Sequence, residues 1–366
     1  MRISEGRKPR LAVTMGDPAG IGPEITLRAL RHPEIRDLCV PVVFGDVDWI
    51  RKVALDLGLK VRIVEFAARA GSIRASDAPV DDGETATILV RQATDAWDSK
   101  KVDGAPRDDL ARRGDACVNV QYGKLSAVAG RAAAQAVIAA ATATMAGEFD
   151  AVVTAPLNKE ALALGGYPYP GHTELLADVT KTQEYGMMLQ SGPLRVVHVS
   201  THVSLVEAIA RVKTQRILQC IRLGYAACRQ QGIQDPRVAV AGLNPHAGEN
   251  RMFGSEDAEE IAPAVAQAIR EGIRASGPHP ADTVFARAVD GAFDLVVAMY
   301  HDQGHIPVKL HGFDSGVNIT LGLPIIRVSV DHGTAFDIAG QGGARERSMC
   351  EALRVAALLV TMLPRG

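Results

Sequence analysis

Short apolar segments, separated by alanine-rich stretches of helical periodicity, place the strongest constraint on the fold of this chain. A strand that is apolar along its whole length is typical of a parallel sheet with helices on both faces. The sequence therefore predicts the α/β layered class. Seven such segments lie at Leu11–Thr14, Val40–Phe44, Ala151–Thr154, Leu194–His198, Arg237–Ala241, Asp294–Ala298 and Ile325–Val330.

Helices are predicted between these strands at Ala127–Ala146, Ser204–Ala210 and Ala258–Glu271. Residues 67–121 are the least regular part of the chain and include a charged run from Lys100 to Asp115. We expect an elaborated surface segment there. A length of 366 residues suits two domains, although composition marks no boundary between them.

Charge and cysteine content narrow the function classes. A formal net charge of -2 with both signs scattered along the chain provides no basic field for nucleic acid, so we expect a small-molecule partner. The five cysteines suggest neither a disulfide framework nor a thiolate metal site, which favours the reducing cytoplasm. No export signal and no membrane helix are expected. The cysteines are Cys39, Cys117, Cys220, Cys228 and Cys350.

Three histidines follow directly after predicted strands: His202, His246 and His301. Loops at the carboxyl ends of parallel strands converge on the ligand crevice, so these imidazoles could meet and bind a divalent metal. For each one taken singly, an ordinary loop histidine is the favoured interpretation, whereas the three together make a metal site an equal alternative. His305 stands four residues after His301, but Gly304 between them and Pro307 just beyond argue against a regular helix, so His305 need not be a ligand.

Two further patterns suit an anionic ligand. The sequence Gly171-His-Thr-Glu174 predicts a helix start with Thr173 as its N-cap, and such an end binds phosphate or carboxylate, although a plain cap is the alternative. Lys309, Asn318 and Arg327 would supply charge-assisted hydrogen bonds, with solvated surface charge as the alternative for Lys309. Arg327 interrupts an apolar strand, where a charge without compensation is costly.

Two glycine-bounded loops precede predicted helices, at Met15–Glu24 and Asp331–Gly340. The first allows close backbone approach to a ligand, but its spacing matches neither the dinucleotide-binding fingerprint nor the P-loop. The second could equally be an ordinary connection. A conventional Rossmann site is therefore not predicted.

Eight sequence blocks together resemble one known family. In chain order they are MGDPAGIGPE, TAPLNKEAL, GHTELL, GLNPHAGE, PADTVFARA, AMYHDQG, GVNITLGLP and SVDHGTAFDIAG. Their order and content are similar to those of the 4-hydroxythreonine-4-phosphate dehydrogenase family of vitamin B6 biosynthesis, from Leu11 to the C-terminal helix. The resemblance implies two α/β/α domains of isocitrate/isopropylmalate dehydrogenase-like architecture, with residues 1–150 and 312–366 in the first and 151–311 in the second.

The resemblance also assigns roles to residues. It implies a homodimer with its active site in the interdomain cleft at the dimer interface, and one metal ligand from the partner subunit. In this sequence the metal ligands are His202, His246 and His301. The substrate contacts are His172, Thr173, Lys309, Asn318 and Arg327. Asp282 and Asp302 lie near the metal and, with Lys309, form the catalytic set. The cofactor contacts are Gly16, Asp17, Gly333, Thr334 and Asp337.

The implied reaction is oxidation of the secondary alcohol of 4-hydroxythreonine-4-phosphate by NAD, with NADP as the alternative cofactor. Decarboxylation to 3-amino-2-oxopropyl phosphate follows. One divalent ion, zinc, magnesium, manganese or cobalt, stabilises the developing alkoxide. Asp302 or Asp282 acting through water is the expected proton acceptor.

Two departures from the family pattern bear on the substrate. Residues 67–121 are longer than expected, and His305 stands where the vitamin-pathway enzymes carry an apolar residue. Family relatives act on 4-phospho-D-threonate, 4-phospho-D-erythronate or cyclic dihydrodiol carboxylates, and these remain alternative substrates. A ligand-binding protein that performs no chemistry is the alternative from another class.

Overall fold

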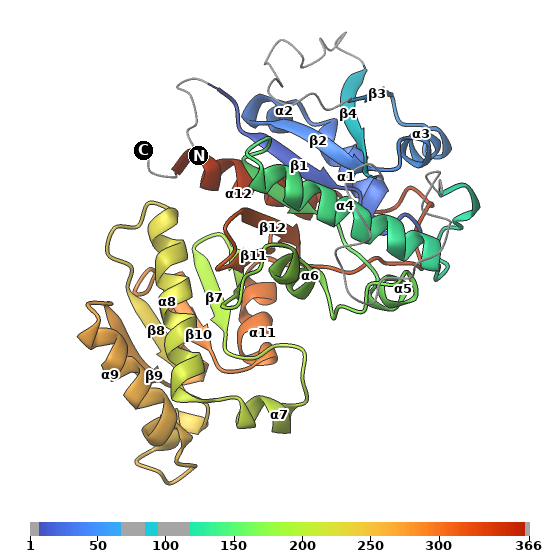
Figure 1. The fold of residues 1–366 in the computed structure, drawn as a ribbon. Helices are drawn as coiled ribbons and strands as arrows, with labels where there is room; N and C mark the ends of the chain where they lie inside the picture. The colour runs from blue at the N-terminus through green and yellow to red at the C-terminus, as the bar shows by residue number, and fades with distance from the viewer. Residues whose placement is uncertain (1–6, 67–84, 94–116, 363–366) are drawn as a thin grey trace. The chain divides into compact units, whose positions relative to one another are not determined.

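All seven apolar segments form strands in the structure, a computed structural model that describes residues 7–66, 85–93 and 117–362 (Figure 1). The expected α/β class is confirmed. The chain divides into two compact units, which are described one at a time. Unit 1 comprises residues 1–182, 323–361 and 365–366, and unit 2 comprises residues 183–322 and 362–364.

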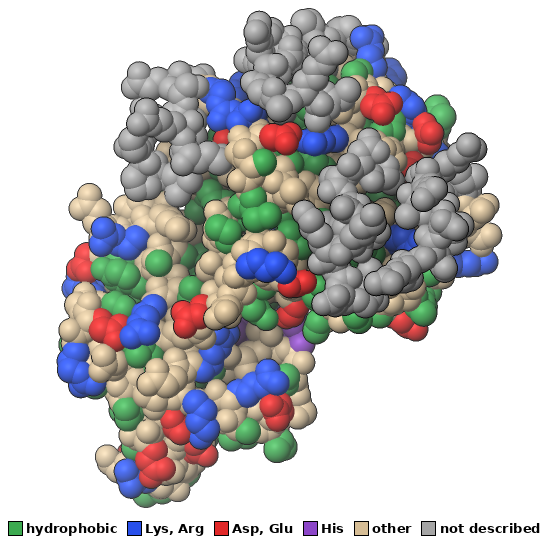
Figure 2. Space-filling view, in the orientation of Figure 1, with side chains coloured by type: hydrophobic (Ala, Val, Ile, Leu, Met, Phe, Trp, Pro, Cys, Tyr) green, Lys and Arg blue, Asp and Glu red, His purple; other side chains and the backbone are tan. Residues whose placement is uncertain are grey.

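The surface has the mixed charge that the composition predicts. Basic and acidic side chains are interspersed over the described residues on the face shown in Figure 2. Across the described ranges, none of the helices has the length and apolar character required to span a membrane.

Unit 1 is built on parallel strands. Its strand order is β3, β4, β2, β1, β5, β12, and each neighbouring pair runs parallel. The strands are β1 (Arg10–Thr14), β2 (Val40–Gly45), β3 (Val61–Glu65), β4 (Ala86–Gln92), β5 (Ala151–Thr154) and β12 (Ile326–Val330). Because β1 and β12 both pair with β5, the loops that follow these two strands leave the same edge.

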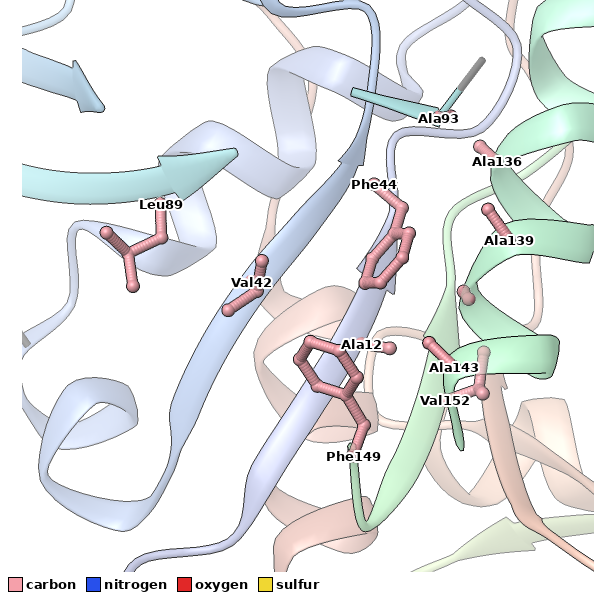
Figure 3. Close-up of a cluster of buried hydrophobic side chains, with 11 residues drawn as sticks. Ala12, Val42, Phe44, Leu89, Ala93, Ala136, Ala139, Ala143, Phe149 and Val152 are labelled. Carbon is pink, nitrogen blue, oxygen red and sulfur yellow. The ribbon is translucent and has the colours of Figure 1, made fainter. Parts of the chain in front are cut away.

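Helices cover the unit 1 strands. They are α1 (Gly22–Leu30), α2 (Pro33–Leu38), α3 (Val47–Asp56), α4 (Ala127–Met145), α5 (Lys159–Leu164), α6 (His172–Val179) and α12 (Arg347–Met362). Figure 3 shows the core where the alanine face of α4 meets the strands. Phe44 and Phe149 meet edge to face there, with ring centroids 5.2 Å apart, a favoured aromatic geometry.

The unit boundaries lie at 182/183 and 322/323, whereas the sequence placed the domain boundaries at 150/151 and 311/312. Two contacts explain why residues 151–182 belong with unit 1. β5 pairs with β1, and α5 lies so close to α4 that a Cβ on Gly130 would be 1.8 Å from the carbonyl oxygen of Ala161. Leu175 and Leu176 of α6 pack on α4 as well.

Unit 2 combines parallel and antiparallel pairs. Its strand order is β11, β6, β7, β10, β8, β9. The antiparallel pairs are β11 with β6 and β6 with β7, whereas β7, β10, β8 and β9 run parallel. The strands are β6 (Gly186–Ser191), β7 (Leu194–His198), β8 (Val238–Ala241), β9 (Ala275–His279), β10 (Leu295–Ala298) and β11 (Val317–Leu321).

Successive strand residues of unit 2 face different helices. Val196 and Val296 pack with Phe285 of α10 and Val308 of α11. Gly224 of α8 lies against Leu295 and Val197 on the other face. The unit 2 helices are α7 (Leu205–Ala210), α8 (Thr214–Gln230), α9 (Ala262–Arg270), α10 (Ala281–Val289) and α11 (His301–Gly312), with a 3-10 turn at Pro245–Gly248 and a π-helical turn at Asp257–Ile261.

Three local expectations are wrong. Within residues 67–121, β4 is a largely buried strand between β2 and β3 rather than surface elaboration, and the charged run Lys100–Asp115 lies outside the described residues. The N-cap of α6 is Gly171, and Thr173 lies inside the helix. His301 to His305 form the first turns of α11, which continues through Pro307 because its buried side packs on β6, β7 and β10.

Candidate active site

Three adjacent parallel strands of unit 2 carry the predicted histidines at their carboxyl ends. His202 follows β7, His301 follows β10 and His246 follows β8. The rings of His202 and His301 lie together, with centroids 5.5 Å apart. Among the described residues there is no group of three His, Cys, Asp or Glu side chains that could hold a metal ion. Within one chain, the structure thus brings two of the three predicted ligands together.

Asp302 fixes one nitrogen of His301. Its Oδ1 lies 2.7 Å from His301 Nδ1, so Nδ1 carries the hydrogen when the ring is neutral and Nε2 is the nitrogen available to a ligand. Asp302 itself is exposed, as expected for an acid that can exchange protons with water. Asp282, the other predicted acid, is also exposed and lies in the first turn of α10.

His246 stands on a left-handed turn of the backbone. All six residues from His246 to Arg251 have positive φ, including 53° at His246 and 54° at Ala247. A left-handed conformation costs roughly 1–2 kcal/mol per non-glycine residue, so the surrounding structure has to hold it. Asp257, which is buried, accepts hydrogen bonds from the backbone of Leu243 (2.9 Å) and Asn244 (3.1 Å), just before the turn.

His305 and His198 extend a stack of imidazole rings from His301 into the interior of unit 2. The ring of His305 stacks on that of His301 at 3.6 Å, and its other neighbour is His198, at 4.6 Å. His198 is 1% exposed and His305 6% exposed. Burial lowers the pKa of His305 to about 4 and that of His198 well below its usual value, so both rings are neutral near pH 7. His305 therefore lies on the buried side of the His301 ring. His198 was not among the site residues predicted from the sequence.

Unit 1 contributes a buried cation. Arg327 on β12 is 2% exposed and donates to the Thr154 hydroxyl oxygen from Nε (3.2 Å) and Nη2 (2.7 Å). Burial lowers the pKa of Arg327 to about 9, and Glu174 opposes the shift. Burial, followed by Arg327, lowers the pKa of His172 well below its usual value. His172 Nε2 is buried without a hydrogen-bond partner, so this corner of unit 1 offers polar atoms to an anion.

Two predicted anion contacts lie in unit 2. Lys309 is exposed on α11, with its ammonium 6.0 Å from the centre of the Phe313 ring. Asn318 is half-buried on β11, and its Oδ1 is buried without a hydrogen-bond partner. An unsatisfied buried amide oxygen is costly and marks a position that a ligand can satisfy.

The predicted cofactor residues occupy the loops after β1 and β12. These loops touch, because Ile21 donates its backbone N–H to the carbonyl oxygen of Thr334 at 2.9 Å. Gly333 and Asp337 are exposed, whereas Gly16 and Asp17 lie in the interior of unit 1. A Cβ on Gly16 would be 2.4 Å from a backbone oxygen of Pro156, so the first loop tolerates no side chain there.

Comparison with known proteins identifies the class of enzyme, because relatives that match almost the whole chain are dehydrogenases. The chain is 46% identical to the D-threonate 4-phosphate dehydrogenase of Cupriavidus necator, over 96% of this chain and 98% of the relative. It is 44% identical to the 4-hydroxythreonine-4-phosphate dehydrogenase of Geobacter metallireducens, over 98% of each.

Solved structures agree with the sequence relatives. The 4-hydroxythreonine-4-phosphate dehydrogenase of Klebsiella pneumoniae is 40% identical and superposes with a TM-score of 0.80, over 96% of this chain and 100% of the other. The sequence model of the family described as pyridoxal phosphate biosynthetic protein PdxA matches residues 37–356. The chain belongs to the PdxA family, as the resemblance predicted.

Proposed function

We propose that this enzyme oxidises the secondary alcohol of a phosphorylated four-carbon hydroxy acid with NAD, using one divalent metal ion, and releases the carboxylate as CO2. The observation that carries the proposal is the pair of imidazoles, His202 and His301, at the ends of adjacent parallel strands. Asp302 orients the second ring, which is the arrangement of a metal ligand supported by a carboxylate.

The donor set suits a transition metal in an open site. His202 and His301 would provide two nitrogens. We propose that His246 of a second copy of the chain provides the third, since two of the three predicted ligands lie together within the described residues of one chain. When bound, the ion would stabilise the alkoxide left after the alcohol loses its proton, from which hydride loss is easier, and would polarise the resulting ketone for decarboxylation. Zinc, manganese, cobalt and magnesium remain candidates, and imidazole ligands favour the first three.

A homodimer is supported by apolar side chains that unit 2 leaves exposed. Val206 on α7 is 79% exposed, Leu310 on α11 is 83% exposed, and Phe313, directly after α11, is 74% exposed. Large apolar side chains mark an interaction surface where they lie in one contiguous patch, and these three are proposed to do so in the dimer interface. The dimer is tested by light scattering of the wild type and of a Leu310→Glu variant. Metal binding should be lost together with dimerisation.

Substrate binding is assigned to five residues. Arg327 remains a cation near pH 7 because its pKa, although lowered, is about 9. With His172 and Thr173 it would bind an anionic group of the substrate, and Lys309 and Asn318 are proposed as further substrate-binding residues. Lys309 would also help position the reacting groups of the substrate. Asp302, with Asp282 as the second candidate, would accept the alcohol proton through water.

NAD is the proposed cofactor. Gly333, Thr334 and Asp337 would contact it, and Gly16 and Asp17 would act through the shape of their loop. The exposed Asp337 carboxylate could accept hydrogen bonds from a ribose diol and would repel the 2′-phosphate of NADP. The proposal predicts a preference for NAD that an Asp337→Asn variant reduces.

The cytoplasm is the proposed location. All five cysteines are free, and four of them are buried. Unpaired thiols fit a reducing compartment.

D-Threonate 4-phosphate is the favoured substrate. The sequence put 4-hydroxythreonine-4-phosphate first, with the phosphorylated sugar acids as alternatives, and relatives with both names are almost equally similar. His305, which departs from the vitamin-pathway pattern, stacks on the ring of His301, one of the proposed metal ligands. D-Threonate 4-phosphate and 4-hydroxythreonine-4-phosphate differ only on one carbon, which carries a hydroxyl group in the first acid and an amino group in the second.

A substrate panel separates the candidates. NADH formation is followed with the metal-loaded enzyme on D-threonate 4-phosphate, D-erythronate 4-phosphate, 4-hydroxythreonine-4-phosphate and a cyclic dihydrodiol carboxylate. We expect the highest kcat/KM on D-threonate 4-phosphate. Turnover of the dihydrodiol alone would contradict the phosphorylated class, and no turnover on any compound would favour a protein that only binds ligands.

A further inference from the structure

Gln303 makes two short hydrogen bonds that join two of the histidine-bearing strand ends. It lies in the first turn of α11 and is 8% exposed. Its Oε1 accepts the backbone N–H of Met299 at 2.7 Å, and its Nε2 donates to the carbonyl oxygen of Gly242 at 2.7 Å. Met299 follows β10, and Gly242 follows β8, so one amide side chain spans both strand ends.

The segment after a third strand, β7, is also hydrogen-bonded to Met299. Ser200 Oγ, in the segment after β7, donates to the carbonyl oxygen of Met299 at 3.1 Å. Met299 is fully buried, and Ser200 is 5% exposed. Both backbone groups of Met299 are thus bound by side chains from segments that carry the predicted ligands.

The spacing of these bonds relates them to the three histidines. Ser200 lies two residues before His202, Gln303 two residues after His301, and Gly242 four residues before His246. An amide side chain presents an acceptor and a donor on neighbouring atoms without charge, so a carboxylate at this position keeps at most one of the two bonds and an apolar side chain keeps neither.

We propose that Gln303 is a positioning residue that sets the His301 turn and the His246 loop at a fixed spacing, with Ser200 fixing the His202 segment to the same point. The inference rests on the proposed function for the role of the histidines as metal ligands. The bonds themselves predict a coupling between the segments whether or not a metal binds.

The test uses the full-length protein with Gln303→Met, which removes both bonds and roughly keeps the volume. Co²⁺ affinity and the visible ligand-field spectrum are measured, together with amide hydrogen exchange of the metal-free protein. Gln267→Met is the matched control, because Gln267 on α9 bonds only exposed partners. We expect Gln303→Met to weaken Co²⁺ binding about 10–100-fold and to alter the spectrum, and the control to do neither.

Hydrogen exchange separates the two levels of the argument. Exchange in Gln303→Met should rise at residues 242–251 and 299–305 together. Unchanged exchange and unchanged Co²⁺ binding would overturn the positioning role. If the wild type binds no Co²⁺, the proposed metal site fails, while raised exchange in both segments still supports the coupling. If Gln303→Met fails to fold, the smaller change Ser200→Ala replaces it. This variant should raise exchange at residues 199–203 and at Met299, and unchanged exchange there would equally overturn the proposal.

Discussion

Replacing Arg327 with methionine should raise the free energy of unfolding and lower the kcat/KM of the enzyme. The fall in the pKa of Arg327 from 12.5 to about 9 corresponds to roughly 5 kcal/mol of cost to the folded state at about 1.36 kcal/mol per pKa unit. Loss of the two bonds to the single Thr154 hydroxyl, whose donor is charged, offsets about 2–3 kcal/mol of that. We therefore expect the free energy of unfolding to rise by about 1–4 kcal/mol, the range seen when buried charges are replaced by apolar side chains.

The sign of the pH dependence follows from the direction of the shift. Because the pKa of Arg327 is lower in the folded state, its cost is fully present below about pH 9 and declines as the pH rises toward 12.5. The gain in Arg327→Met should therefore be constant between pH 6 and 8. Urea unfolding without phosphate measures it. The kcat/KM for the phosphorylated substrate should fall at least tenfold, because a charge-assisted hydrogen bond is lost.

Arg237→Met is the matched control. Arg237 lies near the surface, and its guanidinium donates to both carboxylate oxygens of Asp294, at 2.9 and 3.0 Å, which raises the pKa of Arg237. That substitution should lower stability slightly and leave kcat/KM unchanged. Inorganic phosphate should stabilise the wild type more than Arg327→Met, because it binds only a folded anion site. A loss of stability in Arg327→Met would refute the idea that Arg327 is held at a cost for function.

Three further predictions follow from single contacts. Burial raises the pKa of Asp17 to about 6, so the folded state binds the proton more tightly than the unfolded chain and stability should fall as the pH rises from about 4 to 6; Asp17→Asn should abolish that fall in urea unfolding. Gly304→Ala would put a Cβ 2.3 Å from His198 Nε2. The clash should lower the free energy of unfolding by about 1–3 kcal/mol, and the better helix propensity of alanine should offset about 1 kcal/mol of that loss. His198→Ala should partly restore the stability, and a Gly304→Ala variant as stable as the wild type would contradict the packing. Asp302→Asn should lower kcat about 10–100-fold, and unimpaired turnover would exclude Asp302 both as support for His301 and as the proton acceptor.

The sequence predicted the strands that are apolar throughout and missed those with weaker patterns. Every expected strand formed, because continuous burial in a parallel sheet demands continuous apolar residues. β9, with the sequence ASGPH, carries no apolar signal and is a strand because it pairs with β8. The alternation in β3, VRIVE, was a signal that could have been found.

Helix α11 shows where local signals give way to packing. Gly304 and Pro307 are helix breakers by propensity, yet the helix runs through both. Gly304 is required because His198 lies against it, and no sequence rule states that a histidine on another strand needs that space. His198 and Gln303 were missed for the same reason, since their roles depend on contacts with residues far away in the sequence.

Part of the candidate site was readable from the chain. Residues after strand ends could be selected because parallel strands finish at one edge, and His202 and His301 do lie together. The left-handed turn at His246 could not be predicted, because it also includes alanine, glutamate and arginine, which carry no preference for that conformation. Asp257, and Gln303 through the carbonyl of Gly242, hold that loop from a distance in sequence.

The most direct test of the central claim is the stoichiometry of products from D-threonate 4-phosphate. Wild-type enzyme loaded with a divalent metal ion is incubated with this acid and NAD, and NADH and CO2 are measured in the same reaction. The account predicts equal amounts of both, and neither product from a His202→Ala variant or after chelation of the metal. NADH without CO2, or full activity after removal of the metal or of His202, would contradict it.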